Sequence, residues 1–106
     1  MKPNPISQHG AAIALVQLLE EHPELSKSMS WTIGRVRPHL MGFVHEGGLA
    51  VLNDCVGIVG GEVTVGAPYE QRGGLIVRQH VLASEWRDVS LEIVVSLPVA
   101  AQAVAA

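Results

Sequence analysis

The last third of the chain alternates between hydrophobic and polar residues. From Val89 to Leu97 every second residue is apolar, which is the period of a strand with one buried face. Leu75–Trp86 precedes this segment, and Arg87–Asp88 is placed to turn the chain between them. We therefore predict a hairpin. Its register would pair Trp86 with Val89, Leu82 with Ile93, and His80 with Val95, leaving Val77 and Val81 on the opposite face.

A helical period marks the N-terminal segment. Asn4–Pro5 suits the start of a helix, because Asn can cap free amides and Pro fits the first turn. Pro23 restricts the residue before it and predicts an end at His22. Between these points apolar residues recur at the spacing of one helix face, so we expect that face to be buried. Its residues are Ala12, Leu15, Val16 and Leu19.

Shorter strands and a loop occupy much of the remaining chain. Ser28–Val36 is rich in strand-forming residues, and His39–His45 alternates weakly after the break at Arg37–Pro38, so the two predict a second hairpin. Glu62–Ala67 alternates valines with polar residues and predicts another strand. Ala67–Gly74 contains one proline and two glycines and predicts a loop.

Residues 47–59 are compatible with two structures. Apolar residues three and four positions apart favour a helix, and Gly60–Gly61 would end it. These residues are Leu49, Leu52, Val56 and Val59. Gly57 and several β-branched residues weaken the helix, and Asn53–Asp54 could instead turn a hairpin. We favour the helix.

The predicted order is helix–β–β–helix–β–β–β. A mostly antiparallel sheet with helices packed on one face accommodates this order, which makes the fold class α+β. We expect a single domain over residues 1–97 and an Ala-rich C-terminal tail over residues 98–106.

Composition narrows the classes of function. The chain has 106 residues, of which 48% are hydrophobic and 16% charged, with a formal net charge of −3. This apolar excess is more than a small monomer readily buries, so we expect a homo-oligomer. The acidic balance makes nucleic acid an improbable partner, and the single cysteine excludes a disulfide scaffold. No apolar run is long enough to cross a bilayer. The single Cys55 fits a reducing compartment, so we expect a cytoplasmic protein.

Several short motifs resemble small proteins of actinobacteria, their phages and their integrative plasmids. The similarity spans most of residues 15 to 97. Its motifs are His22–Pro23–Glu24–Leu25, Trp31 with Ile33, Leu40–Met41–Gly42, Gly60–Gly61–Glu62–Val63, and Glu85–Trp86–Arg87–Asp88–Val89. That group has no established activity, so the resemblance implies no site residues. It does imply an accessory protein of a mobile element.

Candidate chemistry is sparse. The weak metal candidates are His39, His80 and Cys55, which lack the short spacing of a compact site, so we expect no metal and no other cofactor. We interpret Cys55 as a small core residue rather than a nucleophile. No nucleophile–base–orienter set is recognisable, so we lean against an enzyme.

The expected function is therefore contact with another protein, as yet unidentified. Tyr69 and Arg72 lie in the longest predicted loop, and Trp86 lies at a hairpin end, so these three are the predicted contact residues. Two alternatives stay open: a nucleic-acid-associated regulator, and a small-molecule-binding protein or enzyme with a pocket between helix and sheet.

Overall fold

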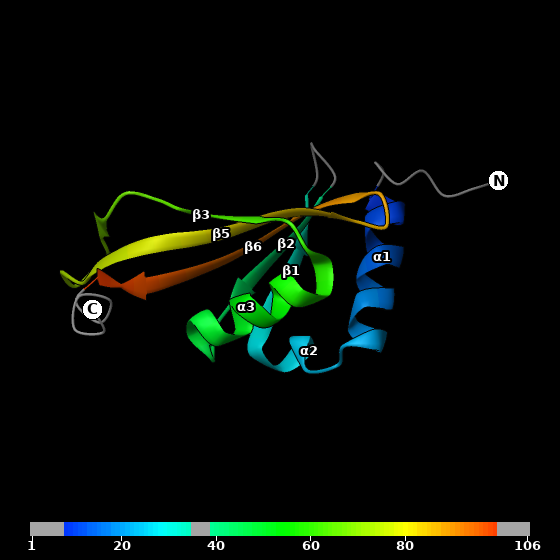
Figure 1. The fold of residues 1–106 in the computed structure, drawn as a ribbon, viewed down its shortest axis with the longest axis horizontal. Helices are drawn as coiled ribbons and strands as arrows, with labels where there is room; N and C mark the ends of the chain where they lie inside the picture. The colour runs from blue at the N-terminus through cyan, green and yellow to red at the C-terminus, as the bar shows by residue number, and fades with distance from the viewer. Residues whose placement is uncertain (1–7, 35–38, 100–106) are drawn as a thin grey trace.

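The computed structural model describes residues 8–34 and 39–99. In these residues, three helices lie on one side of a six-stranded sheet (Figure 1). The helices are α1 (Gln8–Glu21), α2 (Leu25–Ser28) and α3 (Gly48–Val59). The strands are β1 (Met29–Ile33), β2 (Leu40–Val44), β3 (Glu62–Val65), β4 (Tyr69–Glu70), β5 (Ile76–Trp86) and β6 (Val89–Pro98).

The sheet is mixed but mostly antiparallel. Its order is β1-β2-β6-β5-β3, and β4 also pairs with β5. Strands β2 and β6 are parallel, and the other pairs are antiparallel. The predicted α+β class is thus confirmed. The parallel pair joins the N-terminal hairpin to the C-terminal strands.

The β5–β6 hairpin has the predicted register, with Trp86 opposite Val89, Leu82 opposite Ile93, and His80 opposite Val95. Both turn residues have left-handed backbone angles, with φ of 51° at Arg87 and 66° at Asp88. Two such residues between paired strands form a turn whose twist matches that of the strands, although glycine or asparagine is more usual there.

The core lies between the helices and one face of β6. Leu91, Ile93 and Val95 are at most 4% exposed on that face. The neighbouring strands supply Leu40 and Leu82, both fully buried, and the helices add Leu18, Leu52 and Cys55. The alternation in the sequence therefore marks the central face of the sheet.

The orientation of α1 differs from the prediction. The helix ends at Glu21, next to the predicted end, and its predicted start at Asn4–Pro5 lies outside the described residues. Its buried residues are Gly10, Ala11, Ala14 and Leu18. Val16 is 55% exposed, so the prediction that it is buried is wrong. The small residues Gly10, Ala11 and Ala14 face the core and let α1 approach the sheet closely, while Leu15 and Leu19 pack at the side of the core.

The helix predicted over residues 47–59 is confirmed as α3 (Gly48–Val59), with Gly60 as its C-cap at a φ of 70°. Leu49 is nevertheless 44% exposed, because it lies in the first turn, beyond the buried part of the helix. Within the predicted 67–74 loop, β4 was missed, since two residues are too few to show a period. Strand β6 extends one residue past Leu97. Residues 35–38 and 100–106 lie outside the described part.

We expect Ile93→Ala to destabilise the fold by about 2–5 kcal/mol, because it removes fully buried methyl groups from the central strand. Urea unfolding followed by circular dichroism measures this. The exposed neighbour Ser90 provides the control, and Ser90→Ala should change the free energy of unfolding by no more than about 0.5 kcal/mol. Equal effects would contradict the assignment of the core face.

Candidate interaction surface

One end of the sheet extends past the helices. Strands β5 and β6 have 11 and 10 residues, whereas β1 and β2 have five each. The long hairpin reaches away from α1 toward the left of Figure 1, and the molecule measures 53 × 27 × 22 Å. We call the extended part, residues 66–79 and 96–98, the arm.

Exposed apolar side chains concentrate on this end of the sheet and on the strand edge beside it. Of the seven large hydrophobic residues that are exposed in the described chain, five fall between residues 63 and 76. They are Val63, Val65, Tyr69, Leu75 and Ile76, which we call the apolar edge surface. The other two are Val16 and Leu49. Clustering of this kind is typical of an interaction site.

The apolar edge surface extends onto both faces of the sheet. Val63 is opposite Leu82 and therefore points to the helix side. Tyr69 is opposite Val77 and points to the other side, where its hydroxyl lies 3.3 Å from that of Ser96. Val77 is only 1% exposed. The arm thus has a small packed centre of its own, with apolar groups left at its margin.

The structure brings together two of the three predicted contact residues. Tyr69 and Arg72 are both exposed on the arm. Trp86 lies at the other end of β5, nine residues from Val77, which corresponds to about 30 Å of strand. Trp86 therefore lies far from the other two, and the candidate site consists of the two arm residues with the apolar edge surface.

The Trp86 side chain makes its contacts within the molecule. It is partly buried against the core, and the Arg87 guanidinium lies 4.1 Å from the centre of its ring. Arg87 also donates hydrogen bonds to Gln17 Oε1 at 2.8 Å and to Glu21, with a closest distance of 2.6 Å. These contacts fasten the hairpin turn to α1.

The sequence did not identify Val63, Val65 or Ile76 as contact residues. Their alternation with polar residues indicated a strand face but not whether that face is covered. Exposure here follows from the position of β3 at the sheet edge and from the extent of the helices. A β-branched strand next to a glycine-rich turn was the available signal, and many buried strands share it.

The weak metal candidates lie apart. His39 precedes β2, whose first residue Leu40 pairs with Leu91, whereas His80 pairs with Val95 four residues farther along β6. This places them at least about 13 Å apart along the strands. Among the described residues no group of three or more His, Cys, Asp or Glu side chains could hold a metal ion.

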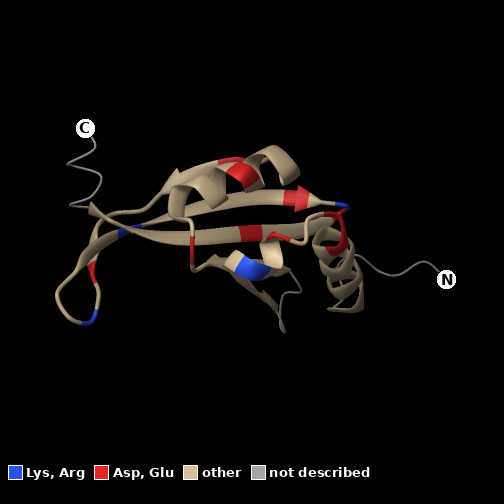
Figure 2. Ribbon diagram, turned by 90° about the horizontal axis from the view of Figure 1, so that it is seen from below, with Lys and Arg blue, Asp and Glu red and all other residues tan. Residues whose placement is uncertain are grey.

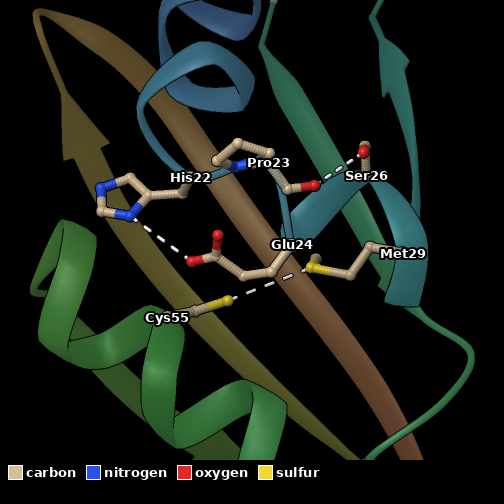
Figure 3. Close-up of polar contacts among 6 residues, drawn as sticks. All are labelled: His22, Pro23, Glu24, Ser26, Met29 and Cys55. Atoms are coloured by element: carbon tan, nitrogen blue, oxygen red, sulfur yellow. Dashed lines mark hydrogen bonds and ion pairs between the residues drawn. The ribbon is translucent and has the colours of Figure 1, made fainter.

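Cys55 is fully buried, with its Sγ 4.0 Å from Met29 Sδ (Figure 3). Burial, with smaller contributions from Asp54 and Glu24, raises the pKa of the Cys55 thiol from 9.0 to about 11. The nearby His22 Nδ1 lies 3.6 Å from Glu24. A protonated, inaccessible thiol is a poor nucleophile, so the interpretation of Cys55 as a small core residue is confirmed.

Charged residues are scattered along the described chain rather than gathered in one place (Figure 2). Arg72 lies on the arm, Arg87 is paired at the opposite end, and Arg78 lies between them on β5, so the described arginines form no single basic surface. Arg35 and Arg37 lie outside the described residues. Within the described part, the Arg78 Nε atom is buried without a hydrogen-bond partner. Arg78 is two residues from Ile76, on the helix side of the arm.

Two further surface properties concern the helices. A shallow depression on the outside of α1 is lined by Ala12, Ile13, Val16 and Gln17. It lies on one helix and does not correspond to the pocket between helix and sheet considered from the sequence. None of the helices in the described ranges is long and apolar enough to span a membrane.

Fold and surface together define a small α+β domain with an uncovered sheet edge. Comparisons with protein-family models, with curated proteins and with solved structures gave no match to this chain.

We expect alkaline pH to reduce the contribution of Cys55 to stability. The folded thiol has a raised pKa, so this contribution is complete below pH 9.0 and is lost as the pH rises through about 11. Urea unfolding of the wild type and of Cys55→Ala should show a stability difference that shrinks above about pH 9. A difference that grows with pH would contradict the assignment.

Proposed function

We propose that this protein is a non-enzymatic interaction protein that acts through protein–protein contacts as a homo-oligomer. Its proposed context is the cytoplasm, as an accessory protein of a phage or plasmid, which rests on the sequence resemblance described above. The contact surface is the arm, with Tyr69 on one face of the sheet, Ile76 on the other face, and Arg72 in the turn between β4 and β5.

One observation carries this proposal: Tyr69, Leu75 and Ile76 of the apolar edge surface are exposed on the arm, which the helices do not cover. Leaving such side chains in water costs about 25 cal/mol for each Å² that a partner would otherwise bury. A partner that covers the arm therefore gains free energy without any rearrangement of the core.

Polar groups on the arm would give the contact specificity. Arg72 is exposed. Arg78, two residues from the exposed Ile76, has a buried Nε atom without a hydrogen-bond partner. Arginine and tyrosine are enriched at protein interfaces, since both combine apolar area with hydrogen-bonding capacity. The proposed partner carries an apolar patch with an accompanying carboxylate, which would satisfy an arginine.

Affinity capture from a lysate of the source organism tests the proposal. We expect wild-type protein to retain a partner that Ile76→Glu loses, because a carboxylate would be buried at the contact. The double substitution Tyr69→Ala with Arg72→Glu should lose the same partner. Ile76 is 43% exposed, so neither change should unfold the protein.

Val16→Glu is the matched control, because Val16 is equally apolar and is exposed on α1, away from the arm. It should retain the partner. If every captured protein binds all variants equally well, the arm is not the contact surface. Circular dichroism of each variant distinguishes a lost contact from a lost fold.

A further inference from the structure

Strand β3 presents unused backbone hydrogen-bonding groups at the edge of the sheet. The Gly66 N–H donates to Gln79 O at 2.9 Å, which fixes the phase of the β3–β5 ladder. Bonded and non-bonded pairs alternate in an antiparallel ladder, so Thr64 directs its N–H and C=O toward β5. Val63 and Val65 therefore direct theirs away from β5, to the open edge.

The same two residues have exposed side chains. Val63 is 39% exposed and Val65 is 50% exposed, and both point to the helix side of the sheet. All four residues of β3 are exposed. Strand edges of natural proteins are usually protected by lysine, proline or a covering element. The β3 strand contains neither residue type, so its short length and the charge of Glu62 are the features that limit pairing.

The opposite edge of the sheet is less accessible. On β1, the Gly34 N–H donates to His39 O at 2.9 Å, so the alternating residues Met29, Trp31 and Ile33 direct their backbone groups outward. Met29 is only 5% exposed, and Trp31 and Ile33 are partly buried. Of the two edges, β3 is the one whose outward residues also leave their apolar side chains exposed.

We propose that β3 pairs antiparallel with β3 of a second copy of this chain, with Thr64 opposite Thr64 of that copy. In this register Val63 lies opposite Val65 of the second copy, and the reverse pair repeats the contact. These two pairs exchange four backbone hydrogen bonds, because Val63 and Val65 carry the outward groups. The same pairs bring the four exposed valines together on one face.

The residues flanking β3 are compatible with this register. Glu62 lies opposite Gly66 of the second copy, so no like charges oppose one another. Gly60 and Gly61 also lack side chains beside the approaching strand. A register centred on Val63 would place Val65 opposite Gly61, whose φ of 96° is not that of a strand. The Thr64 register is thus the one that uses only residues in strand conformation.

This inference gives a geometry to the homo-oligomer of the proposed function, and on that point it rests on the proposal. Its interface is separate from the contact surface around Tyr69, Arg72 and Ile76. A four-residue strand pair makes a small interface of the weak, transient class. We therefore expect monomer and dimer to exchange in a concentration-dependent equilibrium.

Sedimentation velocity over a range of protein concentrations tests the dimer. We expect the wild type to shift from monomer to dimer, and Val65→Lys to remain monomeric, because a lysine at the edge would be buried against the second copy. Val65→Pro should also remain monomeric, since it removes an outward N–H that β5 does not use. Val16→Lys, an equally drastic change on α1, should dimerise like the wild type.

Disulfide trapping tests the register. Two Thr64 residues in a non-bonded antiparallel pair have Cα atoms about 4.5 Å apart, within the range that a disulfide requires. We expect Thr64→Cys to form a covalent dimer under mild oxidation. Glu62→Cys is the matched control on the same strand and face. It should not do so, because the register separates the two Glu62 residues by about 13 Å.

Three results would overturn the edge pairing: a wild type that stays monomeric at every concentration, a dimer that persists in Val65→Lys, or equal cross-linking of the two cysteine variants. If the wild type is monomeric but Ile76→Glu still loses the captured partner, the β3 pairing is overturned and the arm contact stands. A β3 dimer without any arm-dependent partner would do the reverse.

Discussion

The structure depends on burial of one face of β6. This strand lies between β2, which it meets in parallel, and β5, which it meets antiparallel. Leu91, Ile93 and Val95 form the surface on which α1 and α3 pack. The first half of the chain would otherwise have little to join it to the second, because β1 pairs only with β2. Burial of β6 therefore holds the two halves in one domain.

The unequal length of the strands has a direct consequence for the surface. The helices cover the part of the sheet that β1 and β2 also support, and β5 and β6 continue beyond it. On the continuation, Val77 is buried on the face where Tyr69 is its cross-strand neighbour. Apolar groups at the margin of the arm stay in water unless another molecule covers them.

The other end of the hairpin is fixed by polar contacts. A left-handed backbone angle at a residue other than glycine costs about 1–2 kcal/mol, and both Arg87 and Asp88 have one. The hydrogen bonds from Arg87 to Gln17 and Glu21, with its contact to Trp86, offset part of that cost. The hairpin is therefore anchored to α1 at its turn and uncovered at its open end.

The sequence alone determined the α+β class and the hairpin register, because a strict period of two and a two-residue turn are local properties of the chain. It also indicated the buried role of Cys55, because free cysteine is among the residues most often buried. Tertiary structure decided the rotation of α1, the parallel pairing of β2 with β6, and the exposure of Val63 and Val65. The position of Tyr69 and Arg72 in one short segment of the sequence identified them as neighbours, but could not show that Trp86 lies far from both. Periodicity shows which residues share a face, whereas exposure depends on which elements from elsewhere in the chain come to cover that face.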